Sequence, residues 1–421
     1  MPEVYLSIYR HLGVFVFALF ILAPVLVWGA EQPGKRYTLE EILTLAQEKN
    51  PSVGIFRANL EAAQGAMAAS RAYPNPELNV NLGRGKPLGI PGAGYEGEYS
   101  FGIGQPLEWP GKRLYRKRAA EAEVGVARQE SDDFRLELRA QVKEAFFDLL
   151  LSKQILEVSR KNGEAAQALL SAAQARVDSG EAPALELIKA QVELARVTKD
   201  LRRAENRIVL SKAELNSLLG GALGSDDEIS GDLSVARKRY NLTSLLEEAM
   251  ARHPLILRQQ KAMEAAGYAL SRERQSRIPD LVVRGGLNEE IDKRSYSIGL
   301  SLVFPLFYQR QGEIAAARAG EARATAELER ARTELTRLIA QEYQNYQIAL
   351  EQLKIFEEGL LKQADEALRI AQFSYQQGES DLLDLLDAQR VQRATLSEYY
   401  EAQFELDAAL ARLERVTGGL Q

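Results

Sequence analysis

The feature that most restricts the fold of this chain is an internal repeat, because two copies of one pattern should build two copies of one structure. Early matches lie 203 residues apart and later ones 198, since one loop is longer in the first half. We therefore divide the chain into a first repeat at 31–221, a linker at 222–239 and a second repeat at 240–421. The matched residues are Tyr37 and Tyr240, Pro51 and Pro254, Pro76 and Pro279, Gly180 and Gly378, and Gly220 and Gly418.

Each repeat should begin with two helices and continue with two strands. Pro51 and Pro254 each follow a short helical pattern and stand where proline favours the first turn of another helix. Apolar and polar residues then alternate, which predicts strands with one apolar face. The short helices are expected at 39–49 and 243–252, the strands at 77–83, 99–103, 281–283 and 296–302, and the loops between strands at 86–98 and 288–295.

Long helical segments follow the strands. No proline interrupts 112–179 or 313–377, so each stretch predicts one helix of about 100 Å, at a rise of about 1.5 Å per residue. Each helix should end at a glycine, Gly180 or Gly378, in a left-handed conformation. The returning segments carry apolar residues at heptad-like spacing, which predicts antiparallel coiled-coil packing.

Four short amphipathic strands cannot close a membrane barrel by themselves. A sheet edge in lipid would leave backbone groups without hydrogen bonds, and a closed barrel needs about eight strands or more. Several chains should therefore share one barrel. The predicted architecture is mainly α-helical, with a small β-barrel contribution of four strands per protomer and long antiparallel coiled-coil helices that continue the barrel as a tunnel.

The composition excludes several classes of function. A net charge of −6 argues against a nucleic-acid partner, which requires a basic surface. The absence of cysteine excludes disulfides, thiolate metal sites and cysteine nucleophiles. Of the two histidines, His11 lies in the N-terminal apolar segment and His253 precedes a helix-starting proline. We therefore predict no catalytic residue, no metal site and no cofactor, and we do not expect an enzyme.

Residues 1–30 resemble a secretory signal peptide. An apolar run occupies 12–28 behind Arg10, and small residues follow at 29–30. A retained membrane anchor is the competing interpretation, because the positive charge ahead of the run is weak. No later window has the apolar length of a spanning helix, so the exported chain should cross a membrane with its strands.

Several motifs resemble the TolC family of outer-membrane efflux proteins. They are the repeat itself, Pro-Asn-Pro-Glu-Leu at 74–78, Leu-Glu-Trp-Pro-Gly-Lys-Arg at 107–113 and the turns at Gly180 and Gly378. The two longer motifs are most similar to the branch that serves heavy-metal cation pumps. The resemblance implies an outer-membrane homotrimer with twelve strands in one barrel and an α-helical tunnel that extends into the periplasm. It also implies a passive exit duct for drugs or metal cations, surrounded by outer-membrane lipid and docked to a periplasmic adaptor (membrane fusion) protein and an inner-membrane efflux transporter.

The resemblance also assigns roles to residues near the two glycine turns. Asp384 and Asp387 share a helix face, and in a trimer they would form carboxylate rings that attract cations at the pore entrance. Glu186 stands in the first repeat where Asp384 stands in the second. Tyr375 matches a gate tyrosine, although Ser380 occupies the place of the basic partner in the best-known members. The tips expected to dock the adaptor are Gly180, Glu181, Gly378 and Glu379.

Simpler interpretations stay open for these residues. Acidic residues are favoured in the first turns of a helix, and Asp381 could serve only as an N-cap. Tyr375 could pack in a helix seam, and the two glycines could only end helices. For the whole chain, the alternative function is that of a periplasmic adaptor or structural coiled-coil protein of an export complex. That alternative explains the helices but not the duplicated strands.

The strand ends carry a last group of candidate residues. Trp109, Phe304 and Phe307 lie just after strands, where aromatic side chains gather at a membrane interface. Packing at the junction between strands and helices explains them equally well. Arg113 and Arg310 follow in matching positions and are expected to anchor that junction.

Overall fold

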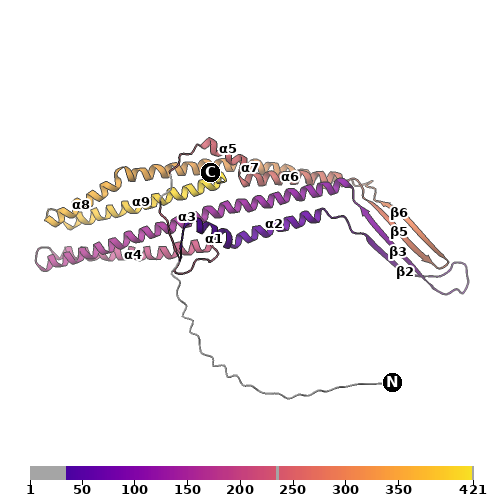
Figure 1. Cartoon of the computed structure of the whole chain (residues 1–421), viewed down its shortest axis with the longest axis horizontal. Coiled ribbons are helices and arrows are strands. Elements are labelled where there is room, and N and C mark those ends of the chain that lie inside the picture. The colour runs from indigo at the N-terminus through magenta and orange to yellow at the C-terminus, as the bar shows by residue number, and fades with distance from the viewer. Residues whose placement is uncertain (1–34, 234–236, 420–421) are drawn as a thin grey trace, which may run out of the picture.

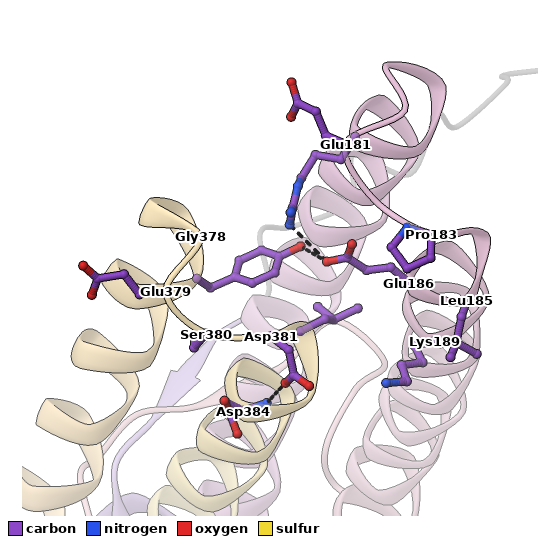
Figure 2. Close-up of a pocket in the computed structure, with 13 residues that line it drawn as sticks. Glu181, Pro183, Leu185, Glu186, Lys189, Gly378, Glu379, Ser380, Asp381 and Asp384 are labelled. Atoms are coloured by element: carbon purple, nitrogen blue, oxygen red, sulfur yellow. Dashed lines mark hydrogen bonds and ion pairs between the residues drawn. The ribbon is translucent and has the colours of Figure 1, made fainter.

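The chain forms one elongated molecule in which the two repeats lie side by side (Figure 1). The computed structural model describes residues 35–233 and 237–419, so the predicted signal peptide at 1–30 lies outside the described residues. The helical hairpins end next to each other at one pole, shown in close-up in Figure 2, and a four-stranded sheet forms the opposite pole. Within the described ranges, no helix combines the length and the apolar character that crossing a membrane requires.

Two short helices open each repeat, as predicted. A complete capping box formed by Thr38 and Glu41 starts the first, and Asn241 caps the corresponding helix of the second repeat. Asn50 and His253 then cap the helices that begin at proline. The four helices are α1 (Leu39–Lys49), α2 (Pro51–Ser70), α5 (Leu242–Arg252) and α6 (Pro254–Gln275).

The four predicted strands form one antiparallel sheet in the order β2-β3-β5-β6. The pairing of β3 with β5 joins the two repeats, and β2 and β6 are the sheet edges. The apolar side chains of β2, β3 and β6 are largely solvent-exposed in the single chain, whereas those of β5 are half-buried; Leu78, for example, is 73% exposed and Ile298 90%. The strands are β2 (Glu77–Gly85), β3 (Glu96–Leu107), β5 (Leu281–Glu290) and β6 (Lys293–Leu302).

The prediction of a loop at 288–295 was wrong, because β5 and β6 run into this segment and leave a turn at 291–292. The sequence there is charged rather than alternating. In the structure Glu289 stands opposite Arg294, and the two side chains form an ion pair of 2.9 Å. Opposite charges on facing strands stabilise the pairing without an apolar face.

A second, two-stranded sheet was not predicted. β1 (Arg36–Tyr37) pairs in parallel with β4 (Glu228–Ile229), which lies in the segment proposed as a linker. Leu223, Ile229 and Leu233 of that segment are buried in the hydrophobic cluster of the first repeat. The part of the predicted linker from 223 to 233 is therefore packed against the first repeat.

The long helices follow the predicted pattern in the first repeat and depart from it in the second. α3 (Pro110–Asp178) runs unbroken for 69 residues, and α4 (Ala184–Leu218) returns beside it. The prediction of one helix over 313–377 was wrong: α7 (Gln311–Ile355) and α8 (Leu361–Gln377) are separated by a π-helical turn at Phe356–Leu360. Gly359 has non-helical backbone angles there, and glycine is a poor helix former that tolerates such a break. α9 (Leu382–Thr417) then returns beside α8.

Arg113 and Arg310 anchor the junction between the sheet and the helices, as predicted. Arg113 donates to the carbonyl oxygen of Arg71 and to the hydroxyl of Tyr73, at 2.8 Å in both cases. Arg310 has a left-handed backbone, with φ at 60°, and pairs with Glu273 at 2.5 Å. This ion pair compensates for a conformation that non-glycine residues rarely adopt.

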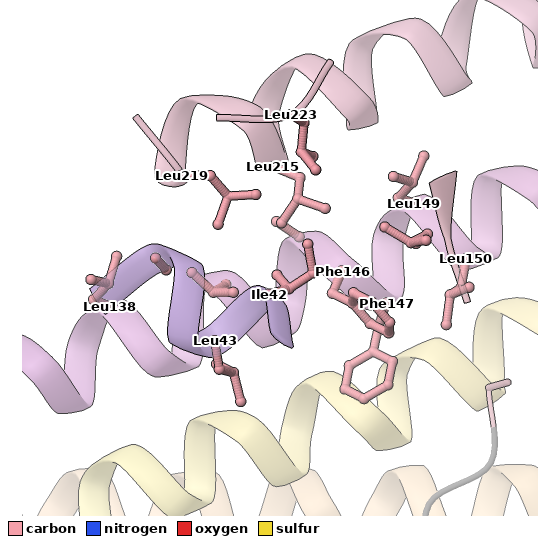
Figure 3. Close-up of a cluster of buried hydrophobic side chains, with 14 of the residues drawn as sticks. Ile42, Leu43, Leu138, Phe146, Phe147, Leu149, Leu150, Leu215, Leu219 and Leu223 are labelled. Atoms are coloured by element: carbon pink, nitrogen blue, oxygen red, sulfur yellow. The ribbon is translucent and has the colours of Figure 1, made fainter. Parts of the chain in front are cut away.

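Each repeat has its own hydrophobic cluster near the middle of the molecule. In the first, side chains from α1, α3 and α4 meet around Phe146, Ile42 and Leu215, which are at most 2% exposed (Figure 3). In the second, α5, α7 and α9 meet around Tyr346 and Leu413. Each fully buried side chain of this size contributes about 1.5–3 kcal/mol to stability. The long hairpins extend from these clusters toward the tips.

Candidate functional site

The candidate site is the pole where the two helical hairpins turn. Both turns are Schellman motifs, in which a glycine adopts a left-handed conformation: φ is +79° at Gly180 and +76° at Gly378. Glu181 N donates to the carbonyl oxygen of Arg176 at 2.8 Å, and Glu379 N donates to that of Ser374 at 2.9 Å. The prediction that these glycines end the helices is confirmed.

The chain enters the returning helices through two different caps. Asp381 accepts hydrogen bonds from the backbone N–H groups of Leu383 (2.8 Å) and Asp384 (3.0 Å), so it is the N-cap of α9. Pro183 occupies the same position at the start of α4 and makes no side-chain cap. The interpretation of Asp381 as a capping residue is therefore confirmed.

A groove of about 570 Å³ lies between the two hairpin tips. Figure 2 shows α4 on one side of it and the turn that leads into α9 on the other. Five acidic and two basic side chains are among its lining residues. The predicted site residues that line it are Glu181, Glu186, Tyr375, Gly378, Glu379 and Asp384.

Three side chains form a connected group inside this groove. The Tyr375 hydroxyl donates to Glu186 Oε1 at 2.6 Å, and Arg176 Nη1 donates to the same oxygen at 3.1 Å. The Arg176 guanidinium also lies over the Tyr375 ring, 5.1 Å from its centre. The contacts join α3, α4 and α8, and so they connect the first repeat to the second.

The electrostatics of this group follow from burial and hydrogen bonding. Burial, and then the bond to the Glu186 carboxylate, raise the pKa of Tyr375, so its hydroxyl keeps the proton that it donates. The pKa of Arg176 is raised, first by its interaction with the Tyr375 hydroxyl and then by the nearby Glu186 carboxylate. The Glu186 side chain is only 10% exposed, and its charge is already compensated within one protomer.

The two remaining acids of the predicted entrance occupy different surroundings. Asp384 is exposed and lines the groove. Asp387 is exposed one turn further along α9, outside the groove, and pairs with Arg390 at 3.3 Å. The structure thus brings Glu186, Tyr375 and Asp384 together and leaves Asp387 beside them on α9.

One charged residue of the groove, Arg176, was not singled out by sequence reasoning. Arg176 stands in the last turn of α3, and a basic residue there also suits the helix dipole. Because basic residues are common at helix ends, nothing in the sequence indicated its contact with Tyr375, which lies 199 residues further along the chain. Ser380 lines the groove with a buried hydroxyl that has no hydrogen-bond partner among the described residues.

The other candidate residues lie away from this pole. Trp109, Phe304 and Phe307 are exposed beside the sheet, and Phe307 is 97% exposed. His253 is buried, and its Nδ1 accepts from the N–H of Leu255 at 3.1 Å, so this side chain is the N-cap of α6. Residues 35–233 and 237–419 contain no group of three or more His, Cys, Asp or Glu side chains arranged to hold a metal ion.

Comparisons with known proteins agree with this arrangement. The family described as "Outer membrane efflux protein" matches residues 42–221 and 245–419, two ranges that lie within the predicted repeats at 31–221 and 240–421. The chain is 26% identical over 384 residues to the cobalt-zinc-cadmium resistance protein CzcC of Cupriavidus metallidurans, covering 89% of this chain and 90% of that protein. It is 23% identical over 407 residues to the pyoverdine export outer membrane protein OpmQ of Pseudomonas aeruginosa, covering 90% and 83%.

Solved structures show the same fold. The structure of CusC superimposes with a TM-score of 0.78 at 16% identity, covering 91% of this chain and 92% of the other. The outer membrane protein VceC of Vibrio cholerae superimposes with a TM-score of 0.76 at 21% identity, covering 90% and 96%. At these identities the similarity concerns the fold alone.

Proposed function

The chain belongs to the outer membrane efflux protein family, and we propose that three copies of it close one continuous duct. The protein is the outer-membrane channel of a tripartite efflux system that exports metals or drugs. The alternative of a periplasmic adaptor or structural coiled coil is not favoured, because both repeats match a family of outer-membrane proteins. We propose no catalytic step: the channel would supply a passage, and the inner-membrane transporter would supply the energy.

The four-stranded sheet is the observation that supports a trimer. β2 and β6 are edge strands, and the apolar side chains of β2, β3 and β6 are exposed in a single chain. Pairing β6 of one copy with β2 of the next would satisfy both edges, and lipid would cover the apolar face. Three copies would supply twelve strands, and the long hairpins would extend the passage from the outer membrane into the periplasm. The partners at the hairpin end would be a periplasmic adaptor and an inner-membrane transporter.

The hairpin tips are the proposed entrance and docking surface. In a trimer, Asp384 and Asp387 would place six exposed carboxylates around the mouth, which favours cations over anions. The exposed turns at Gly180, Glu181, Gly378 and Glu379 would contact the adaptor. Tyr375 is the proposed gate residue, because it joins the two hairpins at the groove.

Divalent metal cations are the proposed substrate class. The similarity to CzcC extends over both repeats, and an acidic entrance suits cations. Deleting the gene should raise the cellular content of Co²⁺, Zn²⁺ or Cd²⁺ during exposure to that ion, measured by elemental mass spectrometry. Unchanged metal content, together with increased retention of an organic compound, would instead assign the duct to drugs.

The acidic entrance is tested in planar bilayers. Asp384→Asn combined with Asp387→Asn should lower cation selectivity and weaken block by multivalent cations applied from the tip side. Asp200→Asn on α4 is the matched control, because Asp200 lies about 20 Å from the tip and pairs with Lys199. Unchanged selectivity and block in the double variant would remove the entrance role from both carboxylates.

A further inference from the structure

We propose that Arg284 of β5 lies in the lumen of the outer-membrane barrel, where its copies from three chains form a binding ring for small multivalent carboxylate anions. The proposal rests on the proposed function, in which three copies close one barrel. It places an anion site inside a passage whose entrance favours cations.

The pairing register gives the sheet one apolar and one polar face. Successive side chains of a strand point to opposite faces, and directly paired residues of neighbouring strands point to the same face. The apolar face contains rows such as Phe101, Leu287 and Tyr296, which are in register across β3, β5 and β6. Arg284 stands three positions before Leu287 on β5, so it lies on the opposite face together with Asn288. Lipid would cover the apolar face of a barrel, and Arg284 would then face the lumen.

Glycine flanks Arg284 on both neighbouring strands. The register places Gly104 of β3 and Gly299 of β6 directly beside it. A Cβ at Gly104 would lie 3.5 Å from Arg284 Cγ and 3.9 Å from its Nε, so the arginine side chain extends along the sheet over this glycine. A Cβ at Gly299 would have no neighbour within 4 Å. Arg284 is exposed, because neither flanking residue has a side chain that could cover it.

The charges of the sheet leave this guanidinium without a partner in the described part of the chain. The ion pair between strands joins Glu289 and Arg294 on the apolar face and does not involve Arg284. Glu77 is in the same row as Arg284 but two strands away, about 10 Å at about 4.8 Å per strand, where salt screens most of the attraction. Glu290 is six residues further along β5, about 20 Å away. Three unpaired guanidinium groups at one level of a lumen suit carboxylates, which arginine binds through two parallel hydrogen bonds.

The experiment measures block by citrate, a tricarboxylate, in planar bilayers that contain the purified full-length protein. Citrate added on the side of the sheet should block the wild-type channel, and Arg284→Gln should raise the half-blocking concentration at least about tenfold, because it removes charge-assisted hydrogen bonds. Arg284→Lys keeps the charge without the paired hydrogen bonds and should give an intermediate value. Glu77→Gln should lower the half-blocking concentration, because it removes a carboxylate that repels citrate. Arg294→Gln is the matched control: it removes an arginine of the neighbouring strand on the apolar face and should leave the block unchanged.

A second measurement tests the face on which Arg284 lies. The chain contains no cysteine, so Arg284→Cys introduces the one thiol of the protein. A charged, water-soluble thiosulfonate reagent should change the current through Arg284→Cys channels. It should leave Ile298→Cys channels unchanged, because Ile298 pairs with Gly285 on the apolar face.

The outcomes separate the ring from the duct. If Arg284→Cys channels do not react, Arg284 does not face the lumen, and the proposal is wrong although the duct function stands. If they react but citrate blocks Arg284→Gln as well as it blocks the wild type, or blocks neither, the arginines do not bind carboxylates. If the wild-type protein forms no channel, the proposed duct function fails, and the anion ring fails with it.

Discussion

Replacing Asp407 by asparagine should remove a large pH dependence from the stability of this protein. Asp407 lies on α9 and is 2% exposed, and its Oδ2 has no hydrogen-bond partner in the described part of the chain. Burial raises its pKa from the ordinary value of 3.8 to about 7. The native protein therefore keeps this proton at pH values where the unfolded chain has released it.

The sign of the effect follows from the direction of that shift. The free energy of unfolding falls as the pH rises from about 4 through 7, because the unfolded state binds fewer protons in that window. Each pKa unit corresponds to about 1.4 kcal/mol, so the loss approaches roughly 4 kcal/mol per chain above pH 7. Asparagine has a similar shape and does not ionise, so the variant should lack this loss.

The assay is chemical unfolding in detergent, followed by circular dichroism between pH 4 and pH 8. The difference between the variant and the wild type should grow in favour of the variant by roughly 4 kcal/mol across this range. If the new amide itself stabilises or destabilises the protein, it changes the free-energy difference by the same amount at every pH and leaves its pH dependence unchanged. Glu398→Gln on the exposed side of α9 is the control for an acid-to-amide substitution on the same helix. If the difference in unfolding free energy between Asp407→Asn and the wild type does not change with pH, the reasoning is refuted.

Two further predictions concern packing and the turns. Phe146→Ala should lower the free energy of unfolding by about 3–5 kcal/mol, because it leaves a cavity at the centre of the first hydrophobic cluster. Phe307→Ala, at an exposed site, is the control and should change the free energy of unfolding little. Equal effects of the two substitutions in unfolding experiments would contradict the importance of the cluster. Gly378→Ala should destabilise the turn by about 1 kcal/mol, because alanine rarely adopts the left-handed backbone of this position, and it should weaken cross-linking to the adaptor. Gly320→Ala inside α7 is the control. Undiminished cross-linking of the Gly378 variant would contradict the docking role.

Much of the architecture could be predicted from local signals that occur twice. Proline marked the starts of α2 and α6, and glycine marked the ends of α3 and α8, because each residue restricts the backbone by itself. The strands were found by alternation, which failed where cross-strand charges such as Glu289 and Arg294 replaced apolar residues. The break at Gly359 was missed because a single glycine in a helix is usually tolerated.

The candidate site was harder to predict because its contacts are distant in the chain. The acidic residues and Tyr375 could be placed near the turns by the resemblance. No local pattern indicates that Glu186 binds Tyr375, or that Arg176 lies over the tyrosine ring. Those contacts depend on how the two hairpins pack, and only the folded chain brings them together.

The central claim is that three copies of this chain form one duct in the outer membrane. The most direct test is the native mass of the protein extracted in detergent from density-separated outer membranes. The account predicts a complex of three chains in that fraction. A single chain, recovered from the soluble periplasm or from the inner membrane, would contradict it.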